Sequence, residues 1–385
     1  MNLLDYSFQI HPALESDLSD IVSLIRNQEK RYAGSLGQPH HASIRKSIQD
    51  QHLLIARING NMVGFVEYYP RSDGWNTIYS IAVDAHWEGM GIGRNLLYSV
   101  PTPIRLKCPQ FVNGNFPNPA TQFYLNAGMK IVGTDLTRSG KLLNVFQLPI
   151  LAVLVQGSNR EIPRVARESG WAYGSRTAET PRDYPFQLDL EFNENWREFD
   201  WNDYMDCVCK YRPVVALALD YFEPDQLPTL LAQITDLKNA GVLRVLVCPK
   251  FHGAVKDIPP SCTVAVSVPS KYAGFLPRFE ELSGRKVHLL GGTPPKWFGS
   301  KRYGRADTGL ISAINGAGGR VVSVDGNAHT GVAEQGGIWI DKVWDFSRKP
   351  LDLYSFAIES GRNILSDLHS ATTTKQLALF TGITL

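Results

Sequence analysis

The sequence is poor in cysteine, in long apolar runs and in net charge. It has 385 residues and five cysteines, an odd number, at Cys108, Cys207, Cys209, Cys248 and Cys262. So few thiols predict no disulfide framework and favour a reducing, cytoplasmic setting. No apolar run approaches the roughly 20 residues of a membrane-spanning helix, and the opening residues lack a basic segment before an apolar one, so we expect neither membrane contact nor a signal peptide. The formal net charge of +2 neither predicts nor excludes a nucleic-acid partner.

The composition and the length instead indicate a globular protein with two domains. Hydrophobic residues make up 43% and charged residues 20% of the chain, which is enough apolar material for real cores. The length exceeds that of one ordinary domain. The pattern of elements changes near Ile150, so we expect one domain over residues 1–150 and a second over 151–385.

The first domain contains strands and helices that do not alternate regularly along the chain. An Asn-Gly pair at Asn59 and Gly60 divides two apolar strands and predicts a hairpin. The remaining predicted strands cover residues 8–14, 75–87, 103–109, 130–138 and 141–150. Amphipathic spacing predicts helices at residues 15–33, 40–50, 94–98 and 118–129. The expected fold is a mixed central sheet flanked by helices.

A glycine-rich loop follows directly after the strand at residues 75–87. The segment "DAHWEGMGIGRNLL", Asp84–Leu97, places Gly89, Gly91 and Gly93 immediately before a predicted helix. Glycines permit a tight turn and a close approach of another molecule, and the first N–H groups of a helix attract phosphate. The loop alone is a common feature, so its meaning depends on its surroundings.

The order of elements, this loop and the segment "NPATQFYLNAGMKIVG" together resemble the Gcn5-related N-acetyltransferase (GNAT) superfamily over residues 5–150. The family's signature is Gln or Arg, two residues, Gly, one residue, then Gly or Ala. Here Glu88 takes the first place, ahead of Gly91 and Gly93. The resemblance implies an acyl-CoA cofactor, such as acetyl-CoA, and the following cofactor-binding residues: Ile81, Ala82, Val83, Gly89, Gly91, Ile92, Gly93, Arg94 and Asn118.

The same resemblance proposes catalytic residues for transfer of an acyl group to an amine. An amine is protonated at neutral pH and needs a base, for which Glu67 is the candidate and Tyr79 and Asp84 are alternatives. Tyr124 matches the family tyrosine that protonates the departing thiolate. Glu67 as a solvated strand carboxylate and Tyr124 as a packing aromatic are the structural alternatives. The acidic Glu88 predicts repulsion of phosphate unless its side chain points away.

The second half predicts an α/β barrel. Eight short apolar runs alternate with helical segments between Leu151 and Asn327, a pattern typical of a (β/α)8 barrel. A doubly wound open sheet is the alternative. The tail from Ser355 predicts one or two closing helices, and "PRFEELSG", residues 277–284, predicts another helix.

Polar residues at the predicted strand ends suggest a barrel site. Asp220 and Asp325 each follow a strand, and Gly291 and Gly292 follow another. Two such carboxylates suit nucleophilic and acid/base roles at a sugar carbon, although an aspartate in this place also caps helices. The segments "YRPVVALALDYF", "HLLGGTPP" and "VVSVDGNA" are distantly similar to the tRNA-guanine transglycosylase superfamily. That similarity implies a nucleophilic Asp325, with Asp220 near the base pocket.

Two further segments bear on partners. Lys301 and Arg302 lie in a stretch that mixes basic and aromatic residues, as contacts with nucleic acid require; a solvated basic loop is the alternative. Cys207 and Cys209 lack further ligands at metal spacing, so we expect no metal and two ordinary buried or half-buried thiols. The leading hypothesis is an acetyl-CoA-dependent N-acetyltransferase fused to a transglycosylase-like barrel that modifies a nucleobase or nucleic acid. The alternative is a small-molecule or protein acetyltransferase with a ligand-sensing barrel.

Overall fold

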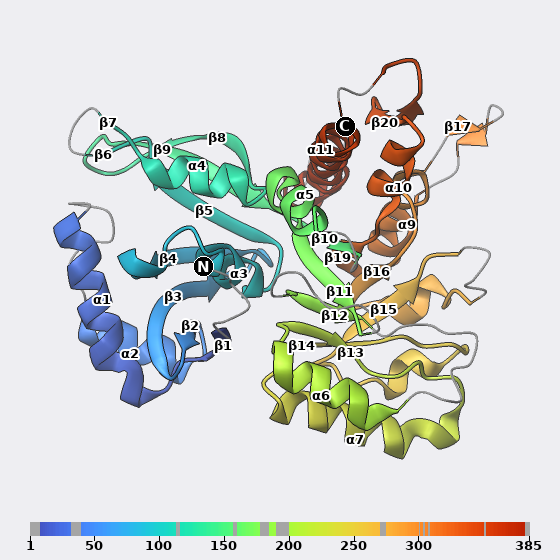
Figure 1. The fold of residues 1–385 in the computed structure, drawn as a ribbon, viewed down its shortest axis with the longest axis horizontal. Helices are drawn as coiled ribbons and strands as arrows, with labels where there is room; N and C mark the ends of the chain where they lie inside the picture. Colours follow the sequence, from blue (N-terminus) through green and yellow to red (C-terminus); the bar gives the residue numbers. More distant parts are fainter. Residues whose placement is uncertain are drawn as a thin grey trace. The chain divides into compact units, whose positions relative to one another are not determined.

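The protein divides into two compact units, Met1–Leu148 (unit 1) and Pro149–Leu385 (unit 2), which are considered separately (Figure 1). The computed structural model describes residues 8–31, 40–112, 116–156, 160–177, 185–189, 200–269, 275–299, 301–302, 305–306, 309–349 and 352–381.

Unit 1 is built on a mixed sheet that has seven strands in the described residues, in the order β1-β2-β3-β4-β5-β9-β8. The strands are β1 (Phe8–Pro12), β2 (Leu53–Ile58), β3 (Asn61–Pro70), β4 (Asn76–Val83), β5 (Ile104–Pro109), β8 (Lys130–Leu136) and β9 (Leu142–Leu148). The predicted hairpin joins β2 to β3. Asn59 and Gly60 both have positive φ, at 48° and 81°, as a tight hairpin turn requires.

Four α-helices of unit 1 occupy the predicted positions: α1 (Leu18–Arg31), α2 (His41–Gln49), α3 (Ile92–Ser99) and α4 (Pro119–Asn126). The apolar stripes of α1 and α2 are buried against the sheet. Ile21 and Leu24 of α1 share one core cluster with Ile44 of α2 and Phe65 of β3. Burial of this stripe stabilises the helices, since short isolated helices are marginal in water.

Strand β4 separates early from its neighbour β5. The two strands are parallel and pair only at Asn76 and Thr77, opposite Ile104 and Arg105. On its other edge β4 pairs with β3 from Asn76 to Val83. Within the described residues, the second half of β4 therefore has an edge with no strand beside it.

Unit 2 is a closed barrel of eight parallel strands in the part of the chain that the structure describes. The strands are β10 (Leu151–Val155), β11 (Ala172–Arg176), β12 (Gln187–Asp189), β13 (Val215–Leu217), β14 (Arg244–Val247), β15 (Thr263–Ser267), β16 (Lys286–Leu290) and β19 (Arg320–Asp325). Strand β10 pairs with both β11 and β19, which closes the ring. The open-sheet alternative is therefore wrong.

The connections depart from a regular alternation of strand and α-helix. Unit 2 contains α5 (Ile162–Ser169), α6 (Trp201–Tyr211), α7 (Leu227–Asn239), α8 (Pro294–Phe298), α9 (Leu310–Gly316), α10 (Ala328–Glu334) and α11 (Leu353–Thr381). Between β14 and β15, however, there is only the 3-10 turn η6 (Ala254–Asp257). The helix predicted at residues 277–284 is reduced to the turn η7 (Phe279–Leu282), since Pro277 and Gly284 leave room for a single turn. The tail forms one helix, α11.

Short two-stranded ribbons complete the described elements: β6 (Phe111–Val112) with β7 (Phe116–Pro117), β17 (Lys301–Arg302) with β18 (Arg305–Ala306), and β20 (Ile338–Ile340) with β21 (Val343–Asp345). None of the helices, as far as the chain is described, combines the length and the apolar character needed to cross a membrane.

Close packing between the first barrel strands gives a stability prediction. A Cβ atom added at Gly174 of β11 would lie 2.8 Å from Val155 Cγ2 and 3.1 Å from Val153 Cγ1. We expect Gly174→Ala to lower the free energy of unfolding by about 1–3 kcal/mol through overpacking, measured by urea denaturation of the full chain. Gly331→Ala is the control, because its Cβ would meet no atom within 4 Å; equal stability of the two variants would contradict the prediction.

Candidate functional site

The glycine loop of unit 1 turns tightly between β4 and α3. Asp84 follows the last residue of β4 and accepts a hydrogen bond from the His86 N–H at 2.9 Å, which caps a 3-10 turn at Ala85–Trp87. Gly89 and Gly91 then adopt φ of 80° and 78°, a backbone conformation that residues other than glycine rarely adopt. Gly91 is the N-cap of α3.

The loop presents a row of unpaired amides. After the loop, the Asn95 N–H donates to the Gly91 carbonyl at 3.0 Å. Within the described parts of the chain, no group accepts a hydrogen bond from the N–H of any residue from Gly89 to Gly93. A Cβ added at Gly89 would meet nothing within 4 Å, whereas one at Gly93 would lie 3.3 Å from Val83 Cγ2 and from Phe123 Cε2, so the open space lies at the start of the loop. Unpaired donors at a helix start, together with the helix dipole, favour an anion.

The acidic Glu88 beside this loop is neutralised by an ion pair. Its Oε1 lies 2.8 Å from Arg31 Nη1, at the end of α1. The expected repulsion of phosphate by Glu88 is therefore opposed by a cation that the sequence pattern did not reveal.

Only part of the predicted β4 edge is open. The Asp84 N–H donates to the Val63 carbonyl of β3 at 2.8 Å. Because backbone groups alternate along a strand, Ala82 also faces β3, whereas Ile81 and Val83 face the open edge. The Val83 carbonyl is occupied there by Gln28 Nε2 of α1, at 2.6 Å. Of the three predicted residues, Ile81 is thus the one best placed to pair with a ligand.

The candidate base Glu67 lies in a buried hydroxyl cluster and is not a solvated strand carboxylate. It is 3% exposed, with Ser47 Oγ at 2.6 Å and Tyr69 OH at 2.7 Å from Oε1, and Ser80 Oγ at 3.0 Å from Oε2. Burial, reinforced by Glu67, raises the pKa of Tyr69. The alternative base Tyr79 is 71% exposed and lies in a bulge of β4 opposite the Glu67–Tyr68 step.

The candidate acid Tyr124 lies on α4, packed between Phe123 and Phe146 with ring centroids at 5.1 and 5.2 Å. Burial, with a smaller contribution from Cys108, raises its pKa above the usual value. Asn118 is the N-cap of α4 and accepts from the Ala120 N–H at 3.0 Å. Its Nδ2 donates to Cys108 Sγ at 3.3 Å. The structure therefore gives Asn118 a capping role, while its predicted role in cofactor binding stays a prediction.

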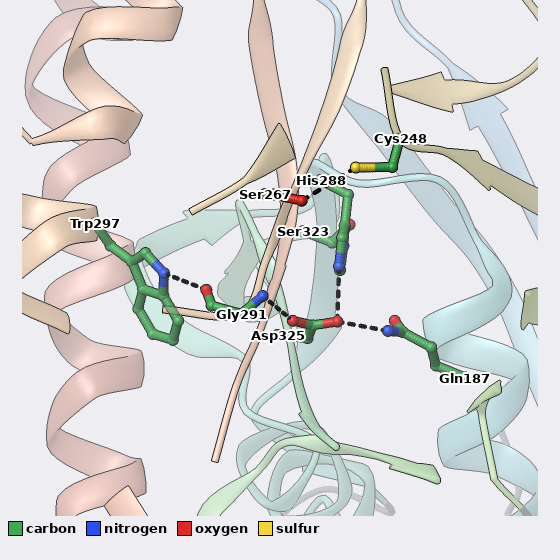
Figure 2. Close-up of polar contacts among 8 residues, drawn as sticks. All are labelled: Gln187, Cys248, Ser267, His288, Gly291, Trp297, Ser323 and Asp325. Atoms are coloured by element: carbon green, nitrogen blue, oxygen red, sulfur yellow. Dashed lines mark hydrogen bonds and ion pairs between the residues drawn. The ribbon is translucent and has the colours of Figure 1, made fainter. Parts of the chain in front are cut away.

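A second polar cluster lies inside the barrel and contains Asp325 (Figure 2). The Oδ2 atom accepts from Gln187 Nε2 at 2.6 Å and lies 3.0 Å from His288 Nε2. The Oδ1 atom accepts from the Gly291 N–H. His288 Nδ1 lies 2.8 Å from Ser323 Oγ. If His288 donates from Nε2 to the carboxylate, a neutral ring accepts at Nδ1 from the Ser323 hydroxyl.

These contacts argue against Asp325 as a free nucleophile. The residue is 2% exposed, and three donors already use its oxygens. A carboxylate that accepts several hydrogen bonds is held in one orientation by them. The geometry thus gives Asp325 a structural role that joins β12, β16 and β19.

Asp220 belongs to a different cluster, beyond the end of β13. Lys250 Nζ lies 3.1 Å from Asp220 Oδ2 and donates to Ser267 Oγ at 2.9 Å. Burial raises the pKa of Asp220, with Lys250 acting in the opposite direction. Burial raises the pKa of Cys248, 3.1 Å from Ser267 Oγ, to about 12. That thiol therefore remains protonated at neutral pH.

The predicted barrel glycines serve local geometry. Gly291 has φ of 71° and Gly292 has φ of 95°. The Gly291 carbonyl accepts from Trp297 Nε1 at 3.1 Å, and a Cβ at Gly292 would lie 2.5 Å from Val268 Cγ1. Lys301 and Arg302 are predicted to contact the substrate. The structure describes the backbone of these two residues but not their side chains.

Two expectations about thiols and metals can be compared with the structure. Cys207 is half-buried, but Cys209 is exposed, so the expectation of burial is wrong for Cys209. No group of three or more His, Cys, Asp or Glu side chains in the described ranges is placed to hold a metal ion.

Sequence reasoning missed several residues of these clusters: Gln28, Arg31, Gln187, Lys250, His288 and Ser323. His288 and Ser323 had a usable signal, because each is a polar residue inside an apolar strand. Arg31 had none, since its partner Glu88 lies far along the chain.

Comparison with known proteins gives separate family matches for the two parts of the chain. Residues 21–100 match the Acetyltransferase (GNAT) family, so this region belongs to a GNAT acetyltransferase domain. Residues 166–366, more than half of the chain, match a family of unknown function (DUF6610). No curated protein is similar enough to count as a match.

Similar solved structures each cover little more than a third of this chain. Ard1 from Thermoplasma volcanium is 16% identical, with coverage of 37% of this chain and 99% of its own and a TM-score of 0.31. The ribosomal-protein-S18-alanine N-acetyltransferase from Escherichia coli is 20% identical, with coverage of 37% and 93% and a TM-score of 0.29. Arabidopsis thaliana Naa50, in complex with the bisubstrate analogue CoA-Ac-MVNAL, is 19% identical, with coverage of 37% and 99% and a TM-score of 0.29.

The Asp325 cluster gives a second stability prediction. We expect Asp325→Ala to cost about 3–5 kcal/mol of unfolding free energy, because it removes one partner of a buried polar pair and leaves the donors of Gln187, His288 and Gly291 unpaired. Urea denaturation of the full chain measures this loss. Glu334→Ala, at an exposed position, should change stability by less than about 0.5 kcal/mol. A similarly small effect of Asp325→Ala would show that the cluster does not stabilise the barrel.

Proposed function

Because the chain belongs to a family of unknown function (DUF6610), we propose its activity from unit 1: this unit binds an acyl-CoA and transfers the acyl group to an amine. The observation that carries the proposal is the row of unpaired amides from Gly89 to Gly93, ahead of α3. The match of residues 21–100 to the GNAT family supports it.

The donor set of the loop fits the diphosphate of coenzyme A. Backbone N–H groups at a helix start bind phosphate oxygens without needing a cationic side chain. Ile81, on the open edge of β4, can pair with an amide of the pantetheine arm as a neighbouring strand would. A bound acyl-CoA supplies an activated thioester, and Gly89, Gly91, Ile92, Gly93 and Arg94 are the residues proposed to hold it.

Tyr124 is proposed as the proton donor to the departing thiolate. Its raised pKa keeps the hydroxyl protonated at neutral pH, which is the state a general acid needs. The proton of the attacking amine is proposed to reach Glu67 through the hydroxyl of Tyr69 or Ser80, since those groups already contact its oxygens.

The acceptor is proposed to be an amine. The proposal includes neither a nucleobase or nucleic acid as the acceptor nor glycosyl transfer by the barrel. The engaged and buried carboxylate of Asp325 gives glycosyl transfer no support. A ligand-binding barrel is the second candidate. In its favour, no described residue donates a hydrogen bond to the buried Gln187 Oε1, and buried acceptors are normally satisfied.

The cofactor proposal is tested by calorimetric titration of the full chain with acetyl-CoA. Wild-type protein should bind saturably, and Gly91→Glu should weaken binding at least about tenfold, because it adds bulk and negative charge where phosphate approaches. The control Gly60→Glu also replaces a glycine of positive φ with open space around it, but in the β2–β3 turn. Retained binding in Gly91→Glu, or no binding by wild type, would reject the proposal.

The role of Tyr124 is tested through Tyr124→Phe. Loss of a general acid typically lowers kcat about 10²–10⁴-fold, while KM for acetyl-CoA should change little. Release of the coenzyme A thiol can be followed against a panel of primary amines. Tyr98→Phe is the matched control, since it removes another buried hydroxyl, bonded to the Ala127 carbonyl at 3.2 Å. An unchanged kcat for Tyr124→Phe would exclude the acid role.

A further inference from the structure

Arg31 and Glu88 form an exposed ion pair at the entrance to the glycine loop. Arg31 Nη1 and Glu88 Oε1 are 2.8 Å apart, and the side chains are 42% and 39% exposed. Glu88 directly precedes the unpaired amides of Gly89–Gly93. Exposed pairs of this kind add little to stability, so stability alone does not explain why an acid and a base are placed at this loop.

The last turn of α1 is fixed at two points beside the loop. Gln28 Nε2 donates to the Val83 carbonyl at the end of β4, and Arg31 bonds Glu88 five residues later in the chain. Residues three apart on a helix share one face. The face that carries Gln28 and Arg31 is therefore directed at the end of β4 and at Glu88, the residue that directly precedes the loop amides.

A guanidinium suits a place between a carboxylate and a phosphate. It carries five N–H donors in a planar fork, and it binds carboxylates and phosphates through charge-assisted hydrogen bonds. One arginine can therefore bond a carboxylate with one corner of the fork and a phosphate with another. Glu88 alone would place a negative charge beside a bound diphosphate.

We infer that Arg31 is a phosphate-binding residue for the acyl-CoA, and that Glu88 is the positioning residue that holds its guanidinium at the loop. This inference rests on the proposed function and adds to it a cation supplied by α1. The acid at residue 88 then serves cofactor binding through Arg31, although it would oppose binding by itself.

The test is calorimetric titration of the full chain with coenzyme A, using wild type, Arg31→Ala, Glu88→Gln and the double variant. We expect Arg31→Ala to raise Kd at least about tenfold, the loss expected for a charge-assisted hydrogen bond. The double variant should remain at least about tenfold weaker than wild type. Glu88→Gln should weaken binding by less than Arg31→Ala does, since the arginine is still present.

The double variant separates phosphate binding from simple neutralisation. If Arg31 only cancels the charge of Glu88, removing both groups restores wild-type Kd, and that result would overturn the inference. Wild-type Kd in Arg31→Ala would do so as well. Arg26→Ala, at an exposed position of the same helix, controls for a general loss of positive charge and should bind as wild type. Failure of wild type to bind coenzyme A would instead reject the proposed function itself.

Discussion

The early separation of β4 from β5 is the constraint on which the proposed site depends. Two paired residues hold the strands together at Asn76 and Thr77, and beyond them the backbone of β4 has hydrogen-bonding groups that no strand satisfies. Buried backbone groups without partners are costly, so this edge needs solvent, a side chain or a ligand. Gln28 satisfies one carbonyl, and the loop amides continue the row of open groups. The site is therefore the place where a continuous sheet is interrupted.

In the barrel, by contrast, the polar side chains of the Asp325 cluster are buried and bonded to one another. Asp325, His288, Ser323 and Gln187 thereby link strands in a closed ring (Figure 2). Hydrogen bonds of this kind fix the side chains that make them, although Gln187 Oε1 accepts no hydrogen bond from a described residue. The carboxylate that looks reactive in the sequence is thus among the least accessible groups of unit 2.

Local patterns in the sequence predict most of the main helices and strands and the kind of fold, although the helix expected at residues 277–284 is only a turn. Asn59 and Gly60 gave the hairpin, the glycines gave the loop before α3, and the eight apolar runs gave the barrel strands. Contacts between distant residues were not predictable in the same way. Glu88 and Arg31 are 57 residues apart, and Gln187 and Asp325 are 138 apart. The exposure of a carboxylate and the charge balance at a loop depend on such contacts, which is why Asp325 and Glu88 were interpreted incompletely from their positions alone.

The pairing of β10 with both β11 and β19 also has a consequence for synthesis on the ribosome. The first strand of the barrel, β10, can pair with β19 only after the chain has been synthesised through residue 325. Until then one edge of β10 has no neighbouring strand. An apolar strand with an open edge is prone to associate with other chains. Closure of the barrel therefore depends on a strand that is synthesised late in unit 2.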